Sequence, residues 1–216
     1  MDISAITALA PVIPVLTIEQ PADAVPLARA LVKGGLPVLE ITLRTATAMA
    51  ALEAIAKEVP QAVVGAGTVL EAAQVEQIQR LGAKFAVSPG CTLALVTATR
   101  AARLPFLPGV QTVSEAMVLA EQGYRILKFF PADAAGGVAW LKGVGAPLAG
   151  LRFCPTGGIG ADTASRAEAQ TGQRRAHRTQ PAQSARCVRR KKLQQAEAPL
   201  GKGHRLRHRL DAGQEG

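Results

Sequence analysis

Short apolar runs alternate with alanine-rich stretches along most of the chain, and this alternation constrains the fold more than any other feature. The runs recur at intervals of roughly 20 to 26 residues, enough for one strand, one helix and two short loops. This spacing predicts an α/β protein with a parallel sheet. The predicted strands are Val12–Ile18, Pro37–Leu43, Ala62–Ala66, Lys84–Val87, Pro105–Leu107, Arg125–Phe130 and Leu151–Pro155.

The stretches between these runs carry signals of helix ends. The second stretch stops at Pro60, and Thr112 with Glu115 has the spacing of a capping box. The predicted helices are Ala22–Lys33, Ala46–Val59, Glu71–Leu81 and Thr112–Gln122.

Seven such units within about 160 residues favour a small (β/α)8 TIM-type barrel over an open doubly wound sheet. No early Gly-x-Gly-x-x-Gly fingerprint follows the first strand, as a dinucleotide-binding sheet would require. Residues 1–164 are therefore expected to form one barrel domain. The eighth strand should fall after residue 164, where no β-branched or aliphatic run exists, so we expect it to be missing or replaced by an unrelated tail.

The net charge of +9 lies entirely in this tail. Residues 1–164 contain 12 basic and 12 acidic residues, whereas residues 165–216 contain 13 and 4. A segment so poor in apolar residues is expected to be disordered or non-native, and its abrupt start resembles a shift of reading frame near residues 164 to 166. A nucleic-acid-binding arm using Arg189, Arg190, Lys191 and Lys192 is the alternative, although the tail lacks aromatic residues for base stacking.

The hydropathy, the position of the first basic residue and the cysteine spacing predict a cytoplasmic protein. No run of 18 apolar residues is present, and the first basic residue is Arg29, so a basic signal-peptide region is missing. Cys91, Cys154 and Cys187 are widely spaced and form no Cys-x-x-Cys pair. They are expected to be reduced thiols that bind no metal.

Polar residues interrupt two strands that should be buried. The alternation of side chains places Glu40, Thr42 and Arg44 on one face of their strand and apolar residues on the other. In a barrel, the polar face points inward near the carboxyl ends of the strands, where active sites of this architecture lie. Glu40 and Arg44 are therefore candidate site residues.

Lys128 is the second interruption, on the same strand face as Ile126 and Phe130. Desolvation lowers the pKa of an amine, and the free amine is the nucleophile that forms a Schiff base. Glu40 could then move protons. A purely structural Lys128–Glu40 pair is the alternative.

A glycine-rich turn, Cys154–Gly160, follows the seventh strand. Barrels often bind phosphate with the loops after strands seven and eight, because glycine lets backbone N–H groups approach an anion. A plain tight turn is the alternative.

Six ordered motifs within about residues 5 to 164 resemble the bacterial 2-keto-3-deoxy-6-phosphogluconate (KDPG) and 4-hydroxy-2-oxoglutarate (KHG) aldolases. The motifs are Pro14–Leu16, Leu39–Thr45, Gly65–Val69, Ser88–Gly90, Lys128–Ala132 and Pro155–Ile159. The resemblance implies a class I aldolase without metal or other cofactor. It also implies a homotrimer.

By this resemblance Lys128 forms the Schiff base with the C2 carbonyl, and Glu40 is the general acid and base. The resemblance further implies that the substrate contacts Arg44, Thr68, Pro89, Phe130 and Thr156, and that its phosphate contacts Gly157 and Gly158.

The implied reaction is cleavage of 2-dehydro-3-deoxy-6-phosphogluconate to pyruvate and glyceraldehyde 3-phosphate. Cleavage of 4-hydroxy-2-oxoglutarate to pyruvate and glyoxylate is a possible side activity. The alternatives are a phosphogalactonate-specific aldolase, an inactive frameshifted product and a basic-tailed nucleic-acid-binding protein.

Overall fold

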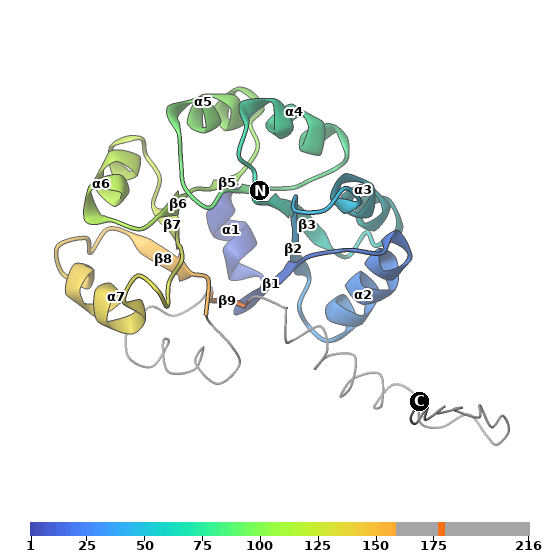
Figure 1. Cartoon of the computed structure of the whole chain (residues 1–216), viewed down its shortest axis with the longest axis horizontal. Coiled ribbons are helices and arrows are strands. Elements are labelled where there is room, and N and C mark those ends of the chain that lie inside the picture. The colour runs from blue at the N-terminus through green and yellow to red at the C-terminus, as the bar shows by residue number, and fades with distance from the viewer. Residues whose placement is uncertain (159–176, 180–216) are drawn as a thin grey trace, which may run out of the picture. The chain divides into compact units, whose positions relative to one another are not determined.

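The computed structural model describes residues 1–158 and 177–179. It divides the chain into Met1–Ala182 and Gln183–Gly216, and the second unit lies outside the described residues. Within the first unit, parallel strands form a ring with helices around it (Figure 1). The α/β barrel architecture predicted from the sequence is confirmed.

The strands form two sheets, with the orders β5-β4-β3-β2-β1-β9 and β6-β7-β8. All seven predicted strands are present, with ends shifted by one or two residues. The strand predicted over residues 105–107 is followed by an additional short one after Pro108, which has no N–H to donate to a ladder. The strands are β1 (Val12–Leu16), β2 (Val38–Thr42), β3 (Val63–Gly67), β4 (Ala86–Val87), β5 (Phe106–Leu107), β6 (Gly109–Val110), β7 (Ile126–Phe129), β8 (Arg152–Pro155) and β9 (His177–Thr179).

One strand in the described part of the tail, β9, lies beside β1, as expected if the eighth strand is replaced by the tail. This three-residue strand pairs in parallel with β1, with Val12 opposite His177 and Pro14 opposite Thr179. Pairing of this kind uses backbone groups, so it does not need the apolar run for which the sequence was searched. Within the described residues no ladder joins β9 to β8. The remaining tail, including Arg189–Lys192, lies outside the described residues.

All four predicted helices are present as α2, α3, α4 and α6, and three further helices were not predicted. The capping box at Thr112 and Glu115 is confirmed. None of the helices in the described part is long and apolar enough to cross a bilayer. The helices are α1 (Ile3–Ala8), α2 (Pro21–Lys33), α3 (Ala48–Glu58), α4 (Ala72–Arg80), α5 (Leu93–Ala101), α6 (Val113–Glu121) and α7 (Gly137–Gly145).

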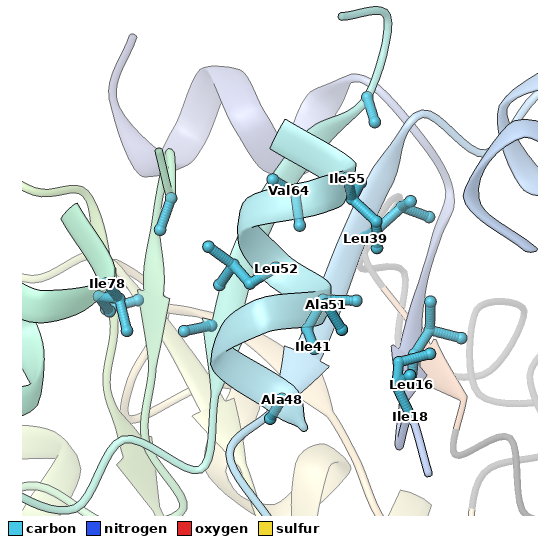
Figure 2. Packing of buried hydrophobic residues seen from close by; sticks show 14 of the residues in the cluster. Leu16, Ile18, Leu39, Ile41, Ala48, Ala51, Leu52, Ile55, Val64 and Ile78 are labelled. Atoms are coloured by element: carbon cyan, nitrogen blue, oxygen red, sulfur yellow. The ribbon is translucent and has the colours of Figure 1, made fainter. Parts of the chain in front are cut away.

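Helix α3 shows how the outer layer is held. Ala48, Ala51, Leu52 and Ile55 lie on one face of this helix, and all are buried against residues of β2 and β3 (Figure 2). The outward residues of those strands include Leu39, Ile41 and Val64. The outward face of each strand is thus apolar, which leaves the inward face available for polar groups.

Helix α1 lies across the middle of the ring (Figure 1). Its Ile6 belongs to a buried cluster with Val38, Phe85 and Ile126, which lie at or near the beginnings of their strands. Arg152, the first residue of β8, donates a hydrogen bond to Ser4 Oγ at 2.7 Å. The helix therefore closes the end of the barrel where the strands begin and leaves the opposite end for a site.

Candidate active site

Glu40 is fully buried at the centre of β2. Its neighbours Leu39 and Ile41 face outward and pack in the cluster that contains α3. The alternation of side chains therefore directs Glu40 and Thr42 into the barrel, as the sequence predicted. Thr42 is also buried, and its Oγ1 donates a hydrogen bond to the Leu16 carbonyl at 3.0 Å.

Lys128 reaches the same space from β7. Its side chain is 3% exposed, and its Nζ lies 3.9 Å from Glu40 Oε1. The neighbouring Leu127 and Phe129 face outward into a separate apolar cluster. Phe130 flanks the amine, with its ring centroid 4.9 Å from Nζ. The structure thus brings the two predicted central residues together from different strands.

Burial lowers the pKa of Lys128 to about 8, and the positive charge of Arg44 adds to this lowering. The Nζ to Oε1 distance of 3.9 Å is longer than a hydrogen bond, so Lys128 and Glu40 form an ion pair without a direct hydrogen bond. With such a pKa, about a tenth of the lysine is the neutral amine at pH 7. This fraction is far above that of an exposed lysine, and the neutral amine is able to attack a carbonyl carbon.

Arg44 and Thr68 lie together at the carboxyl ends of β2 and β3. The exposed Arg44 donates a hydrogen bond from Nε to Thr68 Oγ1 at 3.3 Å. Thr68 adopts a left-handed backbone conformation, with φ of 59°. The remaining guanidinium donors form a fork suited to a carboxylate, and their charge acts on Lys128.

Pro89 is half-buried after β4 and approaches Gly109 of β6. A Cβ placed on Gly109 would lie 2.1 Å from the Pro89 carbonyl oxygen. Gly109 is the register partner of Lys128. The predicted pocket residue Pro89 is therefore brought toward the strand that carries the lysine.

The turn after β8 is anchored to the segment after β7. Thr156 is buried and its Oγ1 donates a hydrogen bond to the Cys154 carbonyl at 3.3 Å. The N–H groups of Ala132 and Asp133 donate to the Thr156 and Gly157 carbonyls at 2.7 and 3.0 Å.

Both glycines of this turn have positive φ, 95° for Gly157 and 75° for Gly158. A Cβ on Gly158 would lie 2.3 Å from Asp133 Cβ, so the position also lacks room for a side chain. Gly158 is exposed, so its backbone is accessible to an anion. Ile159 and Gly160, which complete the predicted turn, lie outside the described residues.

Cys154 is a neighbour of the lysine to which the sequence assigned no role. It is buried on β8 as the register partner of Lys128. Burial raises the pKa of its thiol to about 12, so the group next to the amine is neutral. The sequence did contain a signal for this placement. Cys154 lies two residues before Thr156 and therefore on the same face of the strand, which points into the barrel.

The site thus combines a buried amine of lowered pKa, a buried carboxylate, an arginine and a glycine-rich turn. Comparisons with known proteins agree with this arrangement. The KHG/KDPG aldolase of Escherichia coli K12 is 51% identical over 149 residues, which are 69% of this chain and 70% of that protein.

Two solved structures are similar in fold and sequence. The KDPG aldolase of Legionella pneumophila, with pyruvate captured as a covalent carbinolamine, has a TM-score of 0.79 at 40% identity and covers 86% of this chain and 91% of its own. The KDPG aldolase of Zymomonas mobilis ZM4 with 3-phosphoglycerate has a TM-score of 0.75 at 48% identity, and the match covers 77% of this chain and 79% of that chain.

The family model described as KDPG and KHG aldolase matches residues 3–168, which include every site residue described above. With that match and the identity of about one half to a curated relative, the chain belongs to the KDPG and KHG aldolase family.

Proposed function

We propose that the chain is a class I aldolase that cleaves 2-dehydro-3-deoxy-6-phosphogluconate to pyruvate and glyceraldehyde 3-phosphate. The observation that carries this proposal is the buried Lys128 amine 3.9 Å from the buried Glu40 carboxylate. The carbinolamine of pyruvate in the Legionella pneumophila enzyme supports it. A coupled assay of pyruvate release from the phosphorylated keto acid tests it, and release no faster than from a heat-denatured sample would contradict it.

The chemistry follows from the two groups. The neutral Lys128 amine adds to the C2 carbonyl, and the resulting carbinolamine takes up a proton from solvent and loses water to give a protonated imine. Glu40 removes the proton of the C4 hydroxyl, the C3–C4 bond breaks, and its electron pair moves into the imine to form an enamine. The aldehyde leaves, the same carboxyl group returns a proton to C3, and water releases pyruvate and the free lysine.

Arg44 and Thr68 hold the substrate carboxylate in this proposal. The accessible guanidinium, already oriented by its hydrogen bond to Thr68 at 3.3 Å, supports that role. Pro89 and Phe130 line the pocket beside the lysine, and Thr156 contributes to substrate binding. The backbone of Gly157 and Gly158 contributes to the phosphate site in this proposal, since both glycines have positive φ and Gly158 is exposed to an anion.

Replacing Arg44 by alanine is expected to raise KM for the keto acid by about 10- to 100-fold, because a charged hydrogen-bond partner is worth about 1.5–3 kcal/mol. Steady-state kinetics measure the change. Arg29→Ala is the control, because Arg29 pairs with Glu58 on the outer surface, and its KM should stay within about twofold of the parent. An unchanged KM in Arg44→Ala would contradict the carboxylate role.

Trapping of the imine should follow the titration of Lys128. The pKa of this lysine is lowered to about 8, so the nucleophilic fraction increases as pH rises through that value. The initial rate of borohydride-trapped pyruvyl adduct, corrected for reagent stability, is expected to rise about tenfold from pH 6 to 7 and to level off above pH 9. A rate still rising several-fold between pH 9 and pH 10 would indicate an ordinary lysine.

Two other substrates test the proposed substrate specificity. Cleavage of 4-hydroxy-2-oxoglutarate to pyruvate and glyoxylate needs the same amine and carboxyl group, so we propose it as a side activity. The phosphogalactonate isomer differs from the gluconate substrate at C4. Comparing kcat/KM for the two phosphorylated isomers decides between them, and a preference for galactonate would overturn the proposed substrate.

We propose that the chain acts in the cytoplasm, and that it forms a homotrimer if the family's C-terminal part is intact. Cys91 and Cys154 are free thiols in the described part of the chain, consistent with a reducing compartment. Val113, Met117 and Val118 form an exposed apolar surface on α6, the kind of surface that a subunit interface covers. Residues 1–164 form the aldolase domain in this proposal, and residues 165–216 form a basic tail.

A further inference from the structure

The inward face of β3 carries no side chains at two successive positions. Val64 and Ala66 are buried among the outer apolar residues, so Gly65 and Gly67 point into the barrel. Large groups from the two flanking strands occupy the space beside these glycines. Phe85, next to β4, lies over Gly65, and Glu40 of β2 lies over Gly67.

The space over Gly67 is filled by the catalytic carboxylate itself. A Cβ added to Gly67 would lie 2.0 Å from Glu40 Oε1, 2.5 Å from Cδ and 2.6 Å from Cγ. Gly67 is not among the glycines with positive φ, so its backbone conformation does not demand glycine. The requirement at this position is therefore room for Glu40.

Glu40 has little freedom to move elsewhere. Its register partner on β1 is the buried Val15, and its register partner on β3 is Gly65, over which the Phe85 ring lies. The carboxylate leans over the next inward position of β3, which is Gly67. From there Oε1 is 3.9 Å from Lys128 Nζ.

We propose that Gly67 is a positioning residue, which by lacking a side chain leaves the room in which the Glu40 carboxylate lies within reach of Lys128. This inference rests on the proposed roles of Glu40 and Lys128. It assigns a reason for glycine at the third position of the Gly65–Val69 motif, which the sequence identified only as one of six motifs that resemble the aldolase family.

Gly67→Ala should lower kcat by about 100-fold, because a displacement of about 1 Å at a reacting group costs that much. KM should change by less than about threefold, since Arg44 and the turn after β8 are not moved. Gly143→Ala on α7 is the control. A Cβ there meets nothing within 4 Å and the residue is exposed, so Tm should not fall and kcat should stay within about threefold of the parent.

The same change in a Glu40→Gln background separates positioning from general damage. With no carboxylate to displace, Gly67→Ala should reduce the residual kcat by less than about threefold. If Gly67→Ala alone has the kcat of the parent, the inference is overturned. It is also overturned if adding Gly67→Ala to Glu40→Gln lowers kcat by a further 100-fold relative to Glu40→Gln alone. If Glu40→Gln itself leaves kcat unchanged, the proposed role of Glu40 in proton transfer fails, and this result is distinct from a failure of the positioning role of Gly67.

If Gly67→Ala folds too poorly for kinetics, a second variant tests the same clash through stability. Glu40→Ala removes Cγ and the carboxyl group and so vacates the space that the new Cβ needs. The double variant Gly67→Ala with Glu40→Ala should then fold with a higher Tm than Gly67→Ala alone. If the double variant is no more stable than the single one, the Cβ does not clash with the carboxylate and the inference is overturned.

Discussion

Replacing Lys128 by methionine is expected to reduce aldol cleavage by at least about a thousandfold. Methionine fills a similar volume in the 3% exposed site but has no amine to form the carbinolamine. The residual rate should not respond to pH near 8, because the group that titrates there is gone. Pyruvate release and borohydride trapping on the same sample measure both losses.

Two further variants control for damage to the fold. Lys128→Arg keeps a positive charge beside Glu40 and should be as inactive as the methionine variant, since a guanidinium does not form an imine. Lys142→Met removes an exposed lysine of α7 and should keep full activity. Activity of Lys128→Arg within about tenfold of the parent would contradict a covalent role for the lysine.

Replacing Glu40 by glutamine is expected to lower kcat by about 100- to 10,000-fold, the usual contribution of a general acid and base. The amide keeps the shape of the side chain, so packing over Gly67 is preserved. The Lys128 amine also remains, so prolonged incubation with pyruvate and borohydride should still label it. In this variant kcat is therefore expected to fall, whereas the final extent of labelling of Lys128 is expected to stay the same.

Glu53→Gln is the matched control for this prediction. Glu53 lies on α3 and makes a surface ion pair with Lys57 at 2.6 Å, so its loss should change kcat by less than about twofold. Full turnover by Glu40→Gln would assign proton transfer to another group. Complete loss of labelling would instead mean that the carboxylate is needed to assemble the site.

The inward-facing pair of Glu40 and Lys128 was predictable because strand periodicity is a local property. Glu40 and Lys128 each interrupt a strand whose alternate residues are apolar, and the structure buries both and brings them within 3.9 Å. The sequence therefore indicated which side chains point inward. The resemblance to a family, rather than periodicity, decided between a structural pair and a catalytic one.

The parts that could not be predicted depend on contacts between distant segments. The reason for glycine at position 67 becomes visible only when Glu40 is placed over it. Helix α7 has glycine at both ends and at position 143, so its helix propensity is weak. Trp140 of this helix stacks on Phe129 at a centroid distance of 4.1 Å and holds it against the barrel. β9 has no apolar signal because its pairing with β1 uses the backbone.

Helix α5 was missed although a signal was present. Thr92 caps it by accepting a hydrogen bond from the Leu95 N–H at 3.3 Å. Helix α1 has only six residues, which is too short for a periodic pattern to be read. Its contact with the barrel interior through Ile6 gives it stability that its sequence alone does not indicate.

The central claim is that Lys128 is the amine that forms the Schiff base. The most direct test incubates the whole chain with pyruvate, reduces it with borohydride and maps the modified peptide by mass spectrometry. The account predicts one pyruvyl adduct, on Lys128, that disappears in Lys128→Met and when borohydride is omitted. An adduct confined to another lysine, or none on a folded chain, would contradict it.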